Sequence, residues 1–295
     1  FQNPPFRARE IDFPERMGQD PYAENFMGQS FAKLNFGPIT AGYSTENIWW
    51  GAGVKNSIIM SNNAPGFGHF TINSNKPIKT RSGTLEFQMV GAKLKHSGFK
   101  YPLRYTAGEW PPIAANVVVD SSAPEFHSYF NGVTLVYQPK WTPGLFLGAT
   151  RVVQAVGEPD KISDYFNVLY LSPRNEQLGS SGAFQRNQIV SLSFRYLLTK
   201  ANAEIYGEVG REDWAWDMED FLTRPAATTA WMGGIKKLQK LTGKNKWLEI
   251  MAEVTKIQAP MDNYLKPSST IGYSFYTNNN QVGWTNQGQV IGAGI

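Results

Sequence analysis

The sequence predicts an all-β fold, an antiparallel transmembrane β-barrel of the outer membrane, from its strand alternation, strand length and aromatic content. Between residues 202 and 211, Glu204, Tyr206 and Glu208 alternate with small and apolar residues. Successive side chains of a strand point to opposite faces, so this segment has one polar and one apolar face. Such segments are about 9–11 residues long, which is enough for a tilted strand to cross a bilayer.

The composition fits the same fold. Hydrophobic residues make up 41% and aromatic residues 14% of the 295-residue chain. A barrel keeps its lumen face polar and gathers aromatic residues at the two membrane interfaces, so both values suit it. No stretch approaches the roughly 18 consecutive apolar residues of a transmembrane helix. A soluble β-sandwich is the alternative, because its strands alternate as well.

Strands are expected wherever this alternation returns between breaks rich in Gly, Pro and Asn. The expected strands are 29–36, 40–45, 82–94, 131–139, 144–153, 187–198, 202–211, 228–240 and 246–258, with weaker ones near 270–277 and 283–292. Residues 1–28 are expected to form an N-terminal entry segment and residues 29–295 the barrel, with its closing C-terminal strands outside this sequence. Long loops are expected at 95–128 and 157–186, because barrels alternate short and long connections.

The alternation also predicts which side chains face lipid and which face the lumen. The apolar set is expected on the lipid side: Ala203, Ile205, Leu248, Ile250, Ala252 and Val254. The carboxylates of the same strands are expected on the lumen side: Glu204, Glu208, Glu249 and Glu253. We expect these carboxylates to pair with Arg195, Lys237 or Arg211, as a polar barrel lining usually does.

One segment is unlike the alternating strands. Two tryptophans precede two glycines, and a Ser-Asn-Asn run then leads into a Pro-Gly break, at Trp49, Trp50, Gly51, Gly53, Ser61, Asn62, Asn63, Pro65 and Gly66. This Trp-Trp-Gly…Ser-Asn-Asn-Ala-Pro-Gly arrangement resembles the capsule assembly protein Wzi family. The Gly-Arg-Glu-Asp stretch at 210–213 is similar to a second region of that family.

The resemblance implies an outer-membrane barrel of about eighteen strands, within the range known for single chains. It further implies a lumen occluded by loops, a surface lectin role in holding capsular polysaccharide, and a small helical bundle that we cannot locate in this sequence. Trp49 and Trp50 can stack on sugar rings, but Gly51 and Gly53 favour tight packing inside the barrel. The amides of the motif can bind sugar hydroxyls, but beside a Pro-Gly turn they more often bind backbone.

The candidate ligand-binding residues lie in the first long loop. They combine aromatic rings for sugar faces with cations for acidic sugars: Lys100, Tyr101, Arg104, Tyr105 and Trp110. The competing interpretation is that these aromatic residues bury a partner protein, because Tyr and Trp are also enriched at interfaces.

Other classes of function find little support in the sequence. The acidic cluster Glu212, Asp213, Asp217, Glu219 and Asp220 matches no Ca²⁺ loop and shows no glycosidase pairing, so a solvated helix is the simpler interpretation. His69, His96 and His127 are too scattered for a metal site, and the chain has no Cys. The net charge of +4 is spread thinly, which argues against nucleic acid. We expect no cofactor, no metal and no catalysis.

The predicted function is therefore that of a non-enzymatic outer-membrane barrel that binds capsular or other surface polysaccharide at the cell surface. The alternative is a structural accessory subunit of a larger outer-membrane export or uptake complex. The expected partners are the polysaccharide and the lipid bilayer of the outer membrane, together with other outer-membrane proteins in the alternative.

Overall fold

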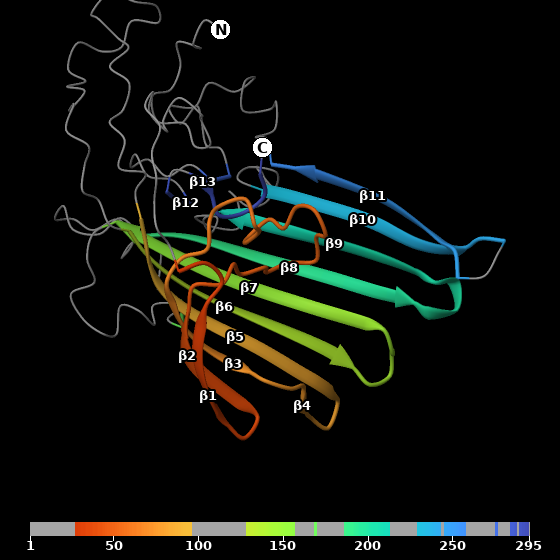
Figure 1. Ribbon diagram of the computed structural model, residues 1–295, viewed down its shortest axis with the longest axis horizontal. Helices are drawn as coiled ribbons and strands as arrows, with labels where there is room; N and C mark the ends of the chain where they lie inside the picture. The colour runs from red at the N-terminus through yellow and green to blue at the C-terminus, as the bar shows by residue number, and fades with distance from the viewer. Residues whose placement is uncertain are drawn as a thin grey trace, which may run out of the picture.

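A single antiparallel sheet dominates the computed structural model, which describes residues 27–95, 128–156, 168–169, 186–212, 229–242, 245–257, 275–276, 284–287 and 289–294. The sheet has 11 strands in the order β1-β2-β3-β5-β6-β7-β8-β9-β10-β11, with β4 paired to β5 (Figure 1). Its strands are β1 Phe31–Phe36, β2 Ile39–Ser44, β3 His69–Ser74, β4 Ile78–Lys79, β5 Gly83–Leu94, β6 Ser128–Pro139, β7 Leu145–Val156, β8 Arg186–Leu198, β9 Ala203–Glu212, β10 Thr229–Lys240 and β11 Trp247–Lys256. Among the described residues no helix is long and apolar enough to cross a membrane.

The sheet is curved (Figure 1). Its two faces differ as the alternation predicts. On β9 the side chains of Ile205 and Val209 are exposed on the convex face, whereas Tyr206 and Glu208 are buried on the concave face. On β11 the apolar set of Leu248, Ile250, Ala252 and Val254 is exposed on the convex side. On these two strands, the side chains therefore lie on the faces that the alternation predicts.

Short and long connections lie at opposite ends of the sheet. The cross-strand pairs Phe36↔Ile39, Leu198↔Ala203 and Lys240↔Trp247 close three of the short connections at one end. The 3-10 helix Thr199–Ala201 forms the connection between β8 and β9. The connections after β2, β5, β7 and β9 are each more than ten residues long and all leave from the other end. This alternation is typical of outer-membrane barrels, whose short turns face the periplasm and whose long loops face outward.

Near the long connections, the convex face is no longer an exposed apolar surface. Leu135 and Leu192 are exposed, but Asn131, four residues from Leu135 on the same face of β6, has no exposed surface. Its Oδ1 accepts a hydrogen bond of 2.9 Å from the Val168 N–H. Arg151 donates to the Val168 carbonyl at 3.0 Å, so the β7–β8 connection is bound to the outer wall at this point. The exposed apolar face of β6 therefore ends before the strand does.

Two expectations about strands were wrong. The strand β3 was not predicted, because its alternation of His69 and Thr71 with Phe70 and Ile72 is short and follows directly on a Gly-rich stretch. The segment 283–292 was expected in the barrel wall, but it forms the separate hairpin of β12 Thr285–Asn286 and β13 Gln289–Val290. Of the segment 270–277, only residues 275–276 are described.

Candidate functional site

The stretch between β2 and β3 crosses the concave face of the sheet instead of looping away from it (Figure 1). We call residues 47–67 the plug segment. It folds back on itself through a bridge between Trp50 and Met60, where the Trp50 N–H donates to the Met60 carbonyl at 3.2 Å. Its contacts reach from β5, through Gln88, to β11, through Glu253. The segment therefore occupies the interior that the curved sheet encloses.

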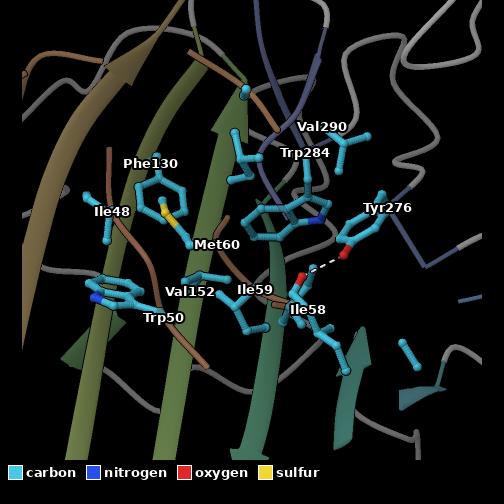
Figure 2. Close-up of a cluster of buried hydrophobic side chains, with 14 of the residues drawn as sticks. Ile48, Trp50, Ile58, Ile59, Met60, Phe130, Val152, Tyr276, Trp284 and Val290 are labelled. Carbon is cyan, nitrogen blue, oxygen red and sulfur yellow. Dashed lines mark hydrogen bonds between the residues drawn. The ribbon is translucent and has the colours of Figure 1, made fainter. Parts of the chain in front are cut away.

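The hydrophobic core of the molecule lies between the plug segment and the sheet. Trp50 is only 3% exposed, and its ring lies against Gly132 of β6 and Val152 of β7 (Figure 2). A Cβ at Gly132 would overlap that ring, so the absence of a side chain is what lets the indole reach the sheet. The indole N–H donates to the Gln88 Oε1 at 2.8 Å, which satisfies the polar atom of this buried residue.

Two carboxylates of the barrel wall bind the backbone of the plug segment. Glu253 accepts hydrogen bonds of 2.8 Å from the Val54 N–H, 3.1 Å from the Lys55 N–H and 2.8 Å from the Asn56 N–H. The Tyr206 hydroxyl donates to the same carboxylate at 2.8 Å. Charged acceptors make hydrogen bonds about twice as strong as neutral ones, so this carboxylate fixes the turn of the plug to β11.

Glu208 serves the same purpose on β9. Its Oε2 accepts from the Ile58 N–H at 3.2 Å and lies 3.5 Å from the Ser57 Oγ. Gly51 has a φ of 130°, and a Cβ there would overlap the Ser57 Oγ and the Glu208 carboxylate. Only glycine combines this backbone angle with so close an approach, so Gly51 is needed where the plug meets Glu208.

The far side of the plug segment contacts the C-terminal part of the chain. The Ser61 N–H donates to the Ile291 carbonyl at 2.8 Å, and the Asn63 Nδ2 donates to the Val290 carbonyl at 3.0 Å. The Tyr276 hydroxyl donates to the Ile58 carbonyl at 2.6 Å (Figure 2). The plug segment is therefore packed between the sheet on one side and the hairpin of β12 and β13 on the other.

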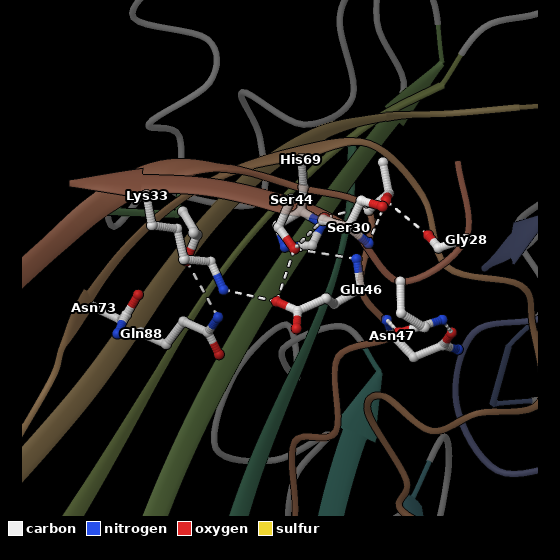
Figure 3. Close-up of polar contacts among 12 residues, drawn as sticks. Gly28, Ser30, Lys33, Ser44, Glu46, Asn47, His69, Asn73 and Gln88 are labelled. Atoms are coloured by element: carbon white, nitrogen blue, oxygen red, sulfur yellow. Dashed lines mark hydrogen bonds and ion pairs between the residues drawn. The ribbon is translucent and has the colours of Figure 1, made fainter. Parts of the chain in front are cut away.

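The start of the plug segment is fixed to the beginning of β1 and the end of β2. Lys33 and Glu46 form an ion pair of 2.7 Å, and the Ser44 Oγ donates to the same carboxylate at 3.0 Å (Figure 3). The hydrogen bond from Lys33 lowers the pKa of Glu46, with a smaller effect of Ser44 in the same direction. The Asn47 N–H donates to the Gln29 Oε1 at 2.7 Å, and its Nδ2 donates to the Ala64 carbonyl at 3.0 Å.

The motif residues predicted from the sequence fall mainly into packing positions. Trp50 is buried, whereas Trp49 is partly exposed and its indole N–H donates to the Gly53 carbonyl at 2.9 Å. Asn62 is exposed. The Ser61 hydroxyl donates to the Gly292 carbonyl, and the Pro65 carbonyl accepts from Asn286 at 3.1 Å. A Cβ at Gly66 would overlap the Thr45 carbonyl.

The predicted ligand-binding residues Lys100, Tyr101, Arg104, Tyr105 and Trp110 lie outside the described residues. The same is true of the acidic cluster except for Glu212, which is buried and accepts from the Asn187 Nδ2 at 2.8 Å. His96 and His127 also lie outside, and the buried His69 has its Nδ1 2.8 Å from the Phe67 carbonyl. Within the described ranges no group of three or more acidic or His side chains is placed to bind a metal ion.

For Glu208, Glu249 and Glu253, the expected pairing with Arg195, Lys237 or Arg211 was wrong. The partners of Glu208 and Glu253 are N–H groups and hydroxyls, as described above, and Glu249 pairs with Lys236 at 3.1 Å. Arg195 instead donates to the Ala52 carbonyl at 2.9 Å. The alternation places the carboxylates on the correct face, but their partners lie about 150 to 200 residues earlier in the chain, where no local pattern points to them.

Comparison with known proteins identifies the family. The model of the capsule assembly protein Wzi family matches residues 19–295, which is most of the chain. The chain belongs to this family. A search of the curated proteins found no match. Among solved structures, the chain is similar to Wzi of Escherichia coli, described as a carbohydrate-binding β-barrel of the outer membrane involved in group 1 capsule assembly. The two share 17% identity with a TM-score of 0.59, over 90% of this chain and 49% of that chain.

Membership in the Wzi family confirms the resemblance that the Trp-Trp-Gly motif indicated, and with it the outer-membrane β-barrel and its location. The chain spans about half the length of the solved barrel. In this family member the connection between β2 and β3 covers the concave face of the sheet from β5 to β11.

Proposed function

We propose that this chain is a non-enzymatic barrel that binds capsular or other surface polysaccharide at the outer face of the outer membrane. The observation that carries the proposal is the plug segment, which fills the concave face from β5 to β11. A barrel filled in this way is poorly suited to conduct solutes. Binding residues concentrate on loops, so we place the ligand site in the other long connections, which leave from one end of the sheet.

The connection between β5 and β6 is our candidate for the polysaccharide-binding surface. It contains Lys100, Tyr101, Arg104, Tyr105 and Trp110, which offer aromatic faces to sugar rings and cations to the carboxylates of acidic sugars.

The two ends of this connection are well anchored. The Lys95 N–H donates to the Asn286 Oδ1 at 3.0 Å, and the Gln287 N–H donates to the Lys95 carbonyl at 2.7 Å. On the other side, Ser128 and Tyr129 at the start of β6 are each only 1% exposed. A fixed base lowers the entropy that the loop loses when it binds a ligand.

The solved E. coli relative supports the same ligand class, because that protein is a carbohydrate-binding barrel. We infer for this chain a polysaccharide ligand, with cations that favour an acidic one. We also propose that the carboxylates around residue 213 do no chemistry, since the sequence shows no recognisable acid–nucleophile pairing among them.

The proposal is tested with the double variant Arg104→Ala and Trp110→Ala. Removal of a charge-assisted hydrogen bond costs about 1.5–3 kcal/mol, so binding of purified acidic capsular polysaccharide should weaken at least tenfold. The matched control is Lys140→Ala with Trp141→Ala, which removes the same kinds of side chain from the opposite end of the barrel. Binding to the control should equal that of the unmodified protein in isothermal titration.

Two results would contradict the proposal. One is polysaccharide binding that is equally weakened by the control, which would mean that the effect is general. The other is a protein that binds no glycan and instead co-purifies in a fixed ratio with another outer-membrane protein. That second result would support the accessory-subunit alternative.

A further inference from the structure

The end of the barrel with short connections carries an excess of positive charge. From β3 onward, every short connection has at least one exposed cation: Lys76 and Arg81 between β3 and β5, Lys140 between β6 and β7, Lys200 between β8 and β9, and Lys246 between β10 and β11. We call these five residues the basic rim. The whole chain has a net charge of only +4, so the basic rim concentrates positive charge at one end.

The carboxylates at that end do not neutralise the basic rim. Glu86, Glu204 and Glu249 occupy strand positions whose side chains belong to the concave face, and Glu249 is paired with Lys236 at 3.1 Å. Among the described residues no carboxylate forms an ion pair with a cation of the basic rim. The positive charges therefore remain available on the outside of the barrel.

The connections that carry the basic rim are hydrogen-bonded to their neighbours. The Lys140 N–H donates to the Ser82 carbonyl at 3.0 Å, and the Leu197 N–H donates to the Gly144 carbonyl at 2.9 Å. The Leu238 N–H donates to the Asn202 carbonyl at 2.8 Å. These bonds tie each turn to the next strand or turn along the sheet, so the cations stand on a continuous and ordered edge.

Exposed tryptophans accompany the cations. Trp141 follows Lys140 directly and is 66% exposed, and Trp247 is 53% exposed with the Lys240 Nζ 5.9 Å from its ring centre. On the convex face of β10, the exposed Ile235 is followed on the same face by the exposed Lys237. Tryptophan and lysine at the point where an apolar outer face ends are the side chains that typically lie among lipid headgroups.

We propose that the basic rim, together with Lys237, binds the headgroups of anionic phospholipids in the leaflet that surrounds the short connections. In an outer-membrane barrel this is the periplasmic leaflet, where phospholipids are the lipids available. An acidic protein would complement the same charges. The tryptophans at the lipid boundary and the outward position of Lys237 favour the membrane surface instead, because they place the cations beside the bilayer.

The test uses the protein purified in detergent and native mass spectrometry with phosphatidylglycerol and phosphatidylethanolamine in competition. The unmodified protein should retain the anionic lipid in preference to the zwitterionic one, and added salt should reduce that preference. Each cation near an anionic surface strengthens lipid binding by a factor of about five, so the double variant Lys140→Gln and Lys237→Gln should lower the preference about 25-fold. Migration of unheated samples on a denaturing gel checks that the variant barrel is folded.

The matched control is Lys256→Gln. Lys256 and Lys237 are both exposed on the convex side of neighbouring strands, but Lys256 lies at the end with long connections. Lys237→Gln alone should lower the preference about fivefold, and Lys256→Gln less than twofold. The proposal is overturned if the unmodified protein shows no preference for the anionic lipid, or if the two single variants lose it equally. A stoichiometric acidic protein bound through the same lysines, without lipid preference, would also overturn it.

Discussion

The turn of the plug segment depends on a single carboxylate, and the substitution Glu253→Gln probes this dependence. In the native protein both carboxylate oxygens accept: one from the Lys55 and Asn56 N–H groups, the other from the Val54 N–H and the Tyr206 hydroxyl. Gln keeps the size of the side chain but replaces one oxygen with an NH₂ group. At least one set of donors then faces another donor, and the negative charge is lost.

The substitution is expected to affect only the turn of the plug, because the Glu253 hydrogen bonds contribute less than the buried apolar side chains that hold the rest of the segment. Hydrogen bonds to a charged group contribute about 1.5–3 kcal/mol, and Glu253 is only partly buried, so we expect a loss of about 2 kcal/mol. The apolar anchors Trp50, Ile58 and Met60 are each at most 3% exposed, and burial of such side chains contributes roughly 1.5–3 kcal/mol apiece. The apolar anchors together exceed the carboxylate, so the plug should stay in place while its turn opens.

Hydrogen exchange measures both parts of this expectation. A loss of about 2 kcal/mol corresponds to a roughly thirtyfold faster exchange of the amides of residues 54–56. The Ser61 amide, which donates to the Ile291 carbonyl, should exchange at the native rate. Glu249→Gln is the matched control, because Glu249 lies on the same strand and face but pairs with Lys236. Unchanged exchange at 54–56 in Glu253→Gln would refute the role of the carboxylate, and equal acceleration at Ser61 would refute the comparison of magnitudes.

Three further predictions concern the barrel and its chemistry. Ile250→Arg places a charge on the exposed convex face of β11 and should cost roughly 2–4 kcal/mol in urea unfolding from lipid vesicles, whereas Ile250→Val should be nearly neutral. The unmodified protein should show low conductance for small solutes in planar bilayers because the plug segment fills the interior, and a large steady pore would contradict that arrangement. Asp213→Asn and Asp217→Asn should cause no catalytic loss with any polysaccharide substrate, and glycan cleavage that disappears in either variant would show that the protein is an enzyme.

The strands of the barrel wall could be predicted from the sequence because the alternation that defines each strand lies within that strand. An alternation of Glu204, Tyr206 and Glu208 with apolar neighbours determines both the strand and its faces, whatever the rest of the chain does. The strand β3 escaped prediction because the Gly-rich stretch before it and the Asn residues within and after it obscure its alternation. The segment 283–292 alternates as well, but it pairs with itself because its backbone also binds Ser61 and Asn63 of the plug.

The interior could be predicted only in part, because it depends on contacts between distant segments. The two glycines after Trp50 indicated close packing, and Gly51 lies where a Cβ would overlap Glu208. Nothing local to Gly132 indicates that its missing side chain admits the Trp50 ring, since 82 positions separate the two residues. Likewise the role of Glu253 requires donors from residues 54–56, and an alternating strand reveals only that its carboxylate faces inward.

The plug segment has a consequence for where this protein can evolve a binding function. Its interior is a packed core in which Trp50 and Met60 are buried as in a soluble protein, so changes there cost stability before they alter a ligand site. The convex face is constrained to be apolar by lipid. Loops that join strands tolerate sequence change better than the strands themselves. The base of the β5–β6 connection is fixed, because Lys95 binds Asn286 and Gln287, so we expect a binding function to evolve in that connection while the barrel wall stays the same.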